Sequence, residues 1–332
     1  MTRAETLYNY PLWDIKRFLC VFLKYAKIHA KEISKKYGGN WRYYFIDMIW
    51  CNFRYGAMDS RDYLLFKFYK KSSRERNSYF TKRRYFRLIR TFDFDVFSKM
   101  LDKDYVNKYY SEFIKRRWIK VDDNTSSDEI KTFFNNTSDV IVKPLSSEQG
   151  RGIYKIKQED VAKVDDFIKT HRGGYLLEEV VKNHPNIDKI NPKSLNTIRV
   201  YTFVNFKGEV LVLSSMLRCG TIGADVDNWG SGGVGYIINK EGFIDKYGVD
   251  KKGNVYYFHP YTNIKMLGYE IPNYSDLINF AKVIAEKQPK AIFCGLDIAI
   301  TPSGFELIEI NFPGGHDFLQ AFGVGFNKVL NG

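Results

Sequence analysis

The sequence has few cysteines and no apolar run long enough to cross a membrane. Its four cysteines, Cys20, Cys51, Cys219 and Cys294, form no C-x-x-C pair, which argues against a disulfide framework and a structural zinc site. The longest apolar runs, such as residues 18–23, fall far below the ~18 residues that a membrane-spanning helix needs, and the first residues contain no apolar signal core. We therefore expect a cytoplasmic protein, with peripheral contact at the inner face of a membrane left open.

Several catalytic motifs are also missing. The chain contains no G-x-x-x-x-G-K-[ST] phosphate loop, no H-E-x-x-H signature among its five histidines and no legible Ser/His/Asp arrangement. The match to G-x-G-x-x-G at residues 230–235 continues into a strand-like segment instead of a helix, which excludes a dinucleotide site. These glycines instead predict a loop that closes over a substrate.

Positive charge is concentrated at one end of the chain. Residues 1–120 contain 28 Lys and Arg against 12 Asp and Glu, whereas the remaining residues contain 23 against 26. A basic, aromatic-rich segment suits nucleic acid, an anionic membrane or a phosphorylated substrate, and a solvated helical face is the plain alternative. Charge alone does not decide among them.

The spacing of apolar residues changes along the chain. Residues 12–37 predict one amphipathic helix ended by the two glycines that follow, and the first hundred residues predict mainly helix. Short β-rich runs predict strands at 140–142, 153–156, 175–181, 197–204, 210–217, 234–238 and 255–258. A helix at 274–287 precedes two last strands, 291–300 and 305–310, joined by a tight turn at 301–304. The sequence therefore predicts an α+β fold with antiparallel sheets.

The final hairpin carries the most specific pattern. Asp297 lies amid apolar residues on one strand, and Glu309 and Asn311 lie two apart on the partner strand, where alternation points both to one face. Carboxylate and amide oxygens are what Mg²⁺ takes, usually together with substrate phosphates. A surface hairpin with ordinary polar residues is the alternative, but Asp is disfavoured in strands and costly to bury unpaired. We therefore predict a metal site at Asp297, Glu309 and Asn311.

A second pattern is a lysine that ends an apolar strand and precedes a Ser/Gly loop. Lys143, followed by Ser146, Ser147, Gly150 and Gly152, can place one ammonium and several backbone N–H groups on a polyphosphate. The same β-loop-β sequence is also compatible with an ordinary hairpin.

Two further segments offer candidate contacts. The strand ending in Glu178 and Glu179 and continuing to Val181 offers an apolar slot and a backbone edge for an adenine ring, although in isolation an edge strand with solvated acids fits it better. Arg199 and Arg218 lie on later strands, where arginines clamp carboxylates or phosphates or form surface ion pairs.

Along the chain, a lysine-ended strand, a Ser/Gly loop, a strand ending in two acids, two arginine-bearing strands and the acidic hairpin follow one another. This succession resembles the ATP-grasp superfamily, and in detail its sugar-transfer-associated branch. The resemblance rests on residues 140–144, 196–199, 227–233 and 307–311, and it covers about 100–320 and more weakly 55–81. It implies an ATP-grasp fold, with a basic helical region at 1–97, a lobe at 98–182 that carries the phosphate loop, and a C-terminal lobe at 183–332 that carries the metal and substrate site.

The resemblance also implies roles for individual residues. Lys143 would contact the α- and β-phosphates of ATP beneath the 150–152 loop, residues 178–181 would form the adenine hinge, and the hairpin would hold Mg²⁺. Lys103 is the best match to an earlier phosphate-binding lysine, with Lys99 and Lys108 as neighbours. The implied substrate-binding residues are Asn196, Asp227, Asn228, Gly232 and Gly233.

The implied reaction is a carboxylate-amine ligation. ATP would phosphorylate a carboxylate, an amine would attack the acyl phosphate, and Arg199 and Arg218 would stabilise the charge that develops. For this branch the resemblance suggests attachment of an amino acid, or of another small amine or acid, to a sugar of a surface polysaccharide, with a sugar acid and an amino acid as candidate substrates. The charge of the N-terminal region separately leaves open a contact with a membrane or a lipid-linked substrate. The alternatives are a kinase that acts on a hydroxyl and a basic nucleic-acid- or membrane-binding protein with a vestigial ATP site.

Overall fold

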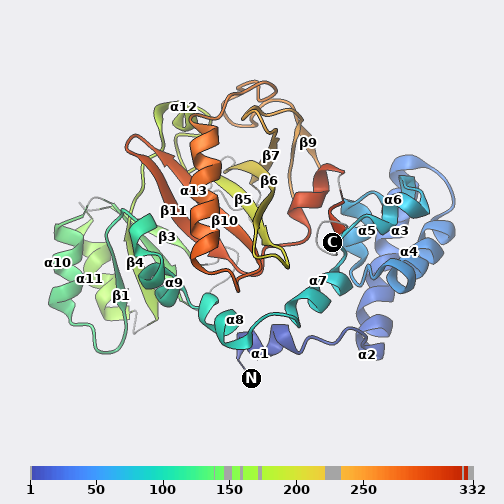
Figure 1. Ribbon diagram of the computed structural model, residues 1–332, viewed down its shortest axis with the longest axis horizontal. Helices are drawn as coiled ribbons and strands as arrows, with labels where there is room; N and C mark the ends of the chain where they lie inside the picture. The colour runs from blue at the N-terminus through green and yellow to red at the C-terminus, as the bar shows by residue number, and fades with distance from the viewer. Residues whose placement is uncertain are drawn as a thin grey trace.

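Two antiparallel sheets and a separate group of helices make up the molecule (Figure 1). The computed structural model describes residues 2–137, 139–145, 152–157, 160–170, 174–220, 233–323 and 325–327. Every strand pairing within these residues is antiparallel, and helices and strands are mixed along the chain. The predicted α+β class is confirmed.

The N-terminal third is helical, as predicted. Its helices are α1 (Arg3–Tyr8), α2 (Ile15–Arg17), the π-helical turn η1 (Phe18–Phe22), α3 (Leu23–Tyr37), α4 (Trp41–Tyr55), α5 (Ser60–Leu65), η2 (Phe68–Lys70), α6 (Ser73–Asn77), α7 (Lys82–Ile89), α8 (Phe94–Met100) and α9 (Lys103–Tyr109). In the part of the chain that the structure describes, no helix is both long and apolar enough to span a membrane.

The single helix predicted over residues 12–37 is instead three consecutive segments. It begins later because Asp14 caps it, with its side chain accepting a hydrogen bond from Arg17 N. A π-helical turn then separates α2 from α3, and the run ends at Gly38, whose φ of 81° lies in a region that favours glycine. The predicted end is therefore correct and the predicted start is wrong.

A four-stranded sheet forms the small lobe. Its order is β1 (Trp118–Val121), β4 (Tyr175–Glu179), β2 (Val140–Pro144) and β3 (Tyr154–Ile156), and α10 (Ser127–Asn135) and α11 (Val161–Thr170) cover one face (Figure 1). The predicted strands of this lobe are present with slightly different ends. Strand β1 and both helices were not predicted.

A seven-stranded sheet forms the large lobe. Its order is β11 (Gly304–Asn311), β10 (Phe293–Thr301), β5 (Thr197–Val204), β6 (Val210–Cys219), β7 (Val234–Ile238), β8 (Gly248–Val249) and β9 (Val255–Tyr256). Strands β5 and β7 have the predicted bounds, and so does α13 (Tyr274–Lys287). The predicted turn joins β10 to β11, where Thr301 pairs with Gly304 and the glycine has a φ of 111°.

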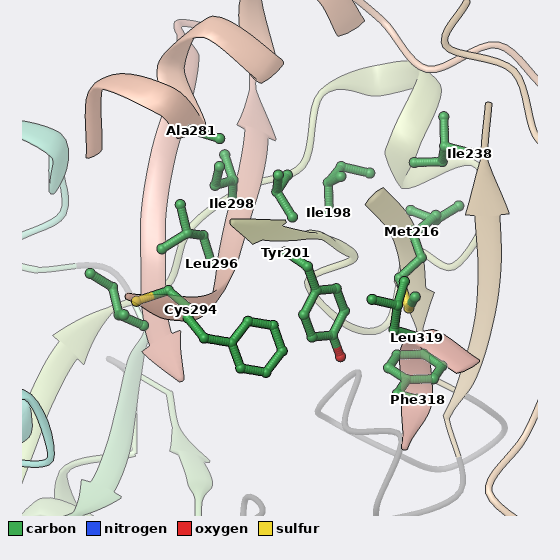
Figure 2. Close-up of a cluster of buried hydrophobic side chains, with 14 of the residues drawn as sticks. Ile198, Tyr201, Met216, Ile238, Ala281, Cys294, Leu296, Ile298, Phe318 and Leu319 are labelled. Carbon is green, nitrogen blue, oxygen red and sulfur yellow. The ribbon is translucent and has the colours of Figure 1, made fainter. Parts of the chain in front are cut away.

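Alternation along β10 assigns its two faces. Leu296 and Ile298 lie on the face beneath α13, close to Ala281 of that helix (Figure 2). Because side chains alternate along a strand, Asp297 lies on the opposite face. That face carries the candidate site.

Three hydrophobic cores underlie these parts. One lies among α3, α4 and α5 and includes Phe22, Met48 and Tyr63, and a second fills the small lobe. The third belongs to the large sheet, and it also takes in buried residues between 80 and 110 from α7, α8 and α9. The division of the chain at residues 97 and 182 stays a prediction.

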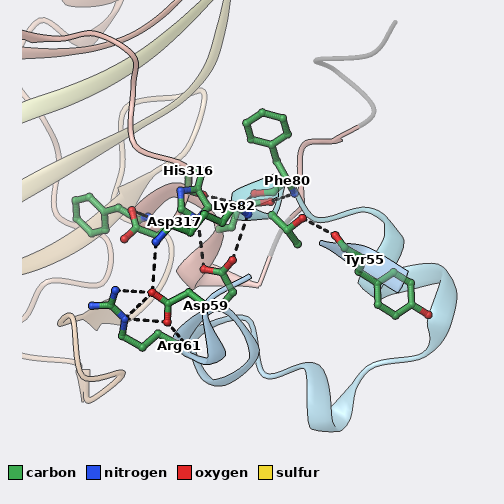
Figure 3. A network of polar contacts seen from close by, with 11 residues as sticks. Tyr55, Asp59, Arg61, Phe80, Lys82, His316 and Asp317 are labelled. Carbon is green, nitrogen blue, oxygen red and sulfur yellow. Dashed lines mark hydrogen bonds and ion pairs between the residues drawn. The ribbon is translucent and has the colours of Figure 1, made fainter. Parts of the chain in front are cut away.

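Hydrogen bonds join the large lobe to the helical group, by which we mean the N-terminal helices around α3, α4 and α5 and the chain that follows them to residue 80. Phe80 N donates to Gln320 Oε1 at 2.7 Å, and Gln320 Nε2 donates to Phe80 O at 2.9 Å. His316, in the loop that leads from β11 to η5 (Phe318–Phe322), contacts Asp62 of α5 at 3.3 Å (Figure 3).

Candidate active site

Asp297 is held between two arginines in the middle of the large sheet. Arg199 of β5 is its neighbour in the register, and its Nε and Nη2 donate to Oδ1 and Oδ2 at 2.5 and 2.7 Å. Arg218 of β6 donates from Nη1 to Oδ2 at 2.6 Å. Sequence analysis proposed these three residues separately, and the structure brings them together.

Charge compensation explains how this carboxylate is tolerated. Burial alone would raise the pKa of Asp297, but Arg199 and Arg218 outweigh it and hold the pKa well below its usual range. Arg199 and Arg218 exceed Asp297 by one positive charge, and the carboxylate of Glu309, which pairs with Asp297 in the register, balances it.

Gly295 makes room for this arrangement. A Cβ built on it would lie 3.1 Å from Cδ of Arg199. An alanine at this position would require the side chain of Arg199 to shift by a few tenths of an ångström, because that contact is tighter than ordinary packing.

A β-bulge sets the acidic residues of the hairpin opposite each other. Asp297 pairs with Glu309 while Ile298 pairs with Leu307, so Ile308 is the extra residue. Asn311 donates its Nδ2 to Asp297 Oδ2 at 3.1 Å. Glu309 is exposed, and no hydrogen bond or ion pair to it exists within the described residues.

Lys143 and Glu178 form an ion pair on the small sheet. Lys143 Nζ lies 2.6 Å from Glu178 Oε2, and Asn107 Nδ2 donates to Oε1 at 3.2 Å. Burial would raise the pKa of Glu178, but Arg116 and Lys143 lower it well below its usual range. Glu178 is therefore a buried anion that orients Lys143.

Lys103 joins Lys143 at the end of β2. It lies in the first turn of α9, and its Nζ donates to Pro144 O at 2.9 Å. Burial lowers the pKa of Lys103, Glu309 opposes that shift, and the charge of Lys143 adds to it. Lys103 therefore interacts electrostatically with the small-lobe lysine and with the large-lobe hairpin.

Arg116 connects the two lobes. Its Nε contacts Glu178 Oε2 at 2.8 Å, and its Nη1 contacts Glu306 Oε1 at 3.0 Å. The same guanidinium donates to the carbonyls of Leu307 at 2.7 Å and Ile308 at 3.1 Å, which are the residues of the bulge. One buried side chain thus links the lysine pair to the strand that carries Glu309.

Of the remaining residues predicted to bind ATP or substrate, those that the structure describes do not take part in the contacts given above. Glu179 lies 3.5 Å from Arg117, and Val181 follows β4. Asn196 is buried and donates to the carbonyls of Ile187 and Asn191 at 3.2 and 3.0 Å, so here it holds the chain before β5. Gly152 has a φ of 72°, and Gly233 directly precedes β7. Ser146, Ser147, Gly150, Asp227, Asn228 and Gly232 lie outside the described residues.

Sequence reasoning missed three members of the site. Arg116, Asn107 and Glu306 occur in no motif, and the partners of Arg116 lie 62 and 190 residues away in the sequence. The only local signal is Glu306 within an apolar strand. A buried acid in such a strand requires a cation, but the sequence does not say which one.

A comparison with protein families identifies the chain. The sequence profile described as "Sugar-transfer associated ATP-grasp" matches residues 106–331, which is more than half of the chain. The chain belongs to this ATP-grasp family. The predicted family and fold are therefore confirmed. No curated protein matches the sequence significantly.

Solved structures similar to this ATP-grasp protein include two ligases. D-alanyl-alanine synthetase A from Vibrio cholerae is 14% identical, with a TM-score of 0.44 over 70% of this chain and 60% of that one. A D-Ala:D-Ser ligase from Enterococcus faecalis has the same identity, TM-score and coverage. The chain thus spans less than two thirds of the length of these structures.

Proposed function

We propose that this ATP-grasp protein is an ATP-dependent carboxylate-amine ligase that binds ATP between its two sheets. The observation that carries this proposal is the position of Lys103, which donates to Pro144 O directly after Lys143 and whose pKa responds to the charges of Lys143 and of Glu309 in the other lobe. Two ammonium groups next to an exposed carboxylate suit a polyphosphate that shares a divalent cation with the protein.

The hairpin residues fit a Mg²⁺ ion that also takes phosphate oxygens. Within the described ranges no three His, Cys, Asp or Glu side chains converge on one point. The hairpin offers the carboxylates of Asp297 and Glu309 and the amide of Asn311, a set with too few ligands for a closed cage but suited to a metal shared with phosphates. When bound, the ion would neutralise charge on the transferred phosphoryl group.

Asp297 would be the most constrained of these ligands. Its Oδ2 already accepts bonds from Arg199, Arg218 and Asn311, whereas Oδ1 accepts one from Arg199. A carboxylate oxygen has two lone pairs, so Oδ1 retains capacity for a further interaction. Glu309, which is exposed, is the hairpin carboxylate with the fewest competing contacts.

The chain's cations supply the remaining chemistry. Lys103 and Lys143 would hold the phosphates of ATP, with Glu178 fixing the position of Lys143. Arg199 uses Nε and Nη2 on Asp297, and no hydrogen bond to its Nη1 exists within the described residues. That N–H group would bind the substrate carboxylate and then its acyl phosphate, whose carbonyl carbon an amine attacks to form the amide and release phosphate.

Substrates of the proposed reaction are a sugar acid and a small amine such as an amino acid, joined in surface polysaccharide biosynthesis. The description of the family supports the sugar component of this proposal. The residues implied in substrate binding, Asn196, Asp227, Asn228, Gly232 and Gly233, and the adenine-hinge residues Glu178, Glu179 and Val181 keep those roles as proposals.

A screen of sugar acids against amines tests the function. Phosphate release is measured for each acid alone, each amine alone and each pair, with ADP quantified in parallel and products identified by mass spectrometry. A ligase releases ADP and phosphate in equal amounts only with a correct pair, and chelation of Mg²⁺ abolishes release. Phosphate that stays on a product formed without an amine would instead identify a kinase.

A further inference from the structure

One face of α4 is apolar and exposed. Tyr43, Ile46, Trp50 and Phe53 have exposed fractions of 64, 65, 56 and 51%. Their spacing of three, four and three residues places them on one side of the helix along most of its length. We call these four residues the α4 stripe.

The stripe is a second apolar face of this helix. The opposite side already buries Met48, Cys51 and Tyr55 in the core that α4 shares with α3 and α5. A surface helix in a monomer needs only one apolar face, so a second exposed one marks a contact site. Trp13 extends the surface, since its ring lies 5.1 Å from that of Phe53.

The charges around the stripe are almost entirely positive. Arg42 and Arg54 are exposed at its two ends. Asp47 is the helix's one acid, and it is bound internally by Arg76 at 2.7 Å and Tyr63 at 2.6 Å. Across residues 12–55 the sequence has nine Lys and Arg against three Asp and Glu.

We propose that the α4 stripe docks on an anionic lipid surface. Aromatic and aliphatic side chains flanked by cations are the combination that enters a membrane interface while the charges stay among the headgroups. The stripe lies in the helical group at one end of the molecule, away from the small lobe (Figure 1). This docking does not depend on which reaction the site performs.

A second copy of the chain fits this face less well. Two α4 helices packed across a two-fold axis would bring Arg42 of one copy towards Arg54 of the other if they ran antiparallel, and towards the other copy's Arg42 if they ran parallel. With Asp47 already bound internally, the helix offers no acid to compensate these cations. Like charges brought together in this way oppose association, whereas anionic lipid neutralises them.

Vesicle sedimentation tests the proposal with the full chain. Wild type is expected to pellet with vesicles of phosphatidylglycerol and phosphatidylcholine but not with phosphatidylcholine alone. The double variant Ile46→Gln/Trp50→Gln should bind the anionic vesicles at least about tenfold more weakly, because two apolar side chains leave the interface. The double variant Arg42→Gln/Arg54→Gln should lose part of the binding and much of its salt dependence.

Matched controls keep the result interpretable. Phe206→Gln and Tyr257→Gln remove exposed aromatic side chains, 88 and 59% exposed, from the large lobe and should leave vesicle binding unchanged. Melting temperatures should match wild type, because all these side chains face solvent. Equal binding by Ile46→Gln/Trp50→Gln and wild type, or no binding to either vesicle, overturns the proposal. If light scattering showed that wild type is a dimer and that Ile46→Gln/Trp50→Gln is a monomer, the α4 stripe would be an interface between two copies of the chain. That result would also overturn the lipid-docking proposal.

Discussion

Lys143 combines a structural contact with a proposed binding role. Replacing it with Met leaves Glu178 with Arg116 at 2.8 Å and Asn107 at 3.2 Å, so the buried acid stays compensated. The ammonium's bond to a phosphate is worth about 1.5–3 kcal/mol. We therefore predict that Lys143→Met weakens ATP binding roughly 10- to 100-fold, measured by calorimetry, with little loss of stability.

A lysine on the next strand provides the control. Lys155 of β3 pairs with Asp139 at 2.5 Å, and Lys155→Met should leave ATP affinity unchanged. Equal ATP affinity of Lys143→Met and wild type would remove Lys143 from the nucleotide site.

Asp297 and Glu309 of the hairpin should respond differently to amide substitution. Asp297→Asn leaves Arg199 and Arg218 buried around a neutral group, which costs about 3–5 kcal/mol of stability. Glu309→Gln removes an exposed charge and should change the free energy of unfolding by less than about 0.5 kcal/mol. If Glu309 binds Mg²⁺, the variant should need at least about tenfold more Mg²⁺ for half-maximal phosphate release.

Urea unfolding and Mg²⁺ titration of both variants separate the two effects. Glu286, near the end of α13, is an acid outside the site, and Glu286→Gln serves as the matched control. An unchanged Mg²⁺ requirement in Glu309→Gln would show that the hairpin does not bind the metal through this residue.

At the scale of elements, Arg116 is expected to fix the bulge in β11. Its guanidinium reaches the carbonyls of Leu307 and Ile308, and the bulge at Ile308 is what places Glu309 opposite Asp297. Arg116→Lys keeps a charge beside Glu178 but cannot span both carbonyls and both acids. We predict a raised Mg²⁺ requirement for this variant, with ATP affinity changed much less.

Arg117→Lys is the control, because Arg117 is half exposed and pairs only loosely with Glu179 at 3.5 Å. Mg²⁺-dependent phosphate release and nucleotide binding are measured on the three proteins. A parallel loss of ATP affinity and Mg²⁺ response would mean that Arg116 holds the whole interface between the lobes instead of the bulge.

Local patterns identified the elements that the site is built from. The β5 run is apolar and β-branched, and α13 has a helical period, so both were predicted with their observed bounds. Helix α10 was predictable as well, because Ser126 and Glu129 form a capping box that the sequence displays. Strand β1 was missed because its four residues, Trp118–Val121, alternate weakly and take their pairing from β4.

Contacts between distant segments set the limit of the sequence-based prediction. Asp297 was identified as a buried acid that needs a cation or a metal, and Arg199 and Arg218 as possible clamps. That the arginines hold this acid follows only from the order β10, β5, β6 in the sheet. The same holds for Arg116, whose partners come from both lobes.

At the scale of the molecule, the helical group meets the large lobe through a histidine. His316 contacts Asp62 of α5 at 3.3 Å, and the charges of Asp317 and Lys82, which lie in the same polar network (Figure 3), also act on it. Burial alone would lower the pKa of His316, but the charge of Asp62, assisted by Asp317 and opposed by Lys82, raises it. The imidazolium therefore favours docking of the helical group on the large lobe.

This raised pKa fixes the direction of a pH effect. Protonated His316 makes its full contribution to the free energy of unfolding below the unfolded-state pKa of about 6.5. That contribution is lost as the pH rises through the higher folded-state pKa. We predict that wild type loses about 1 kcal/mol of stability relative to His316→Gln between about pH 5 and pH 8, because the variant has no proton to release.

Urea unfolding at several pH values measures the difference. If the stability of wild type minus that of His316→Gln stayed constant with pH, or increased as the pH rose, His316 would be neutral at this junction.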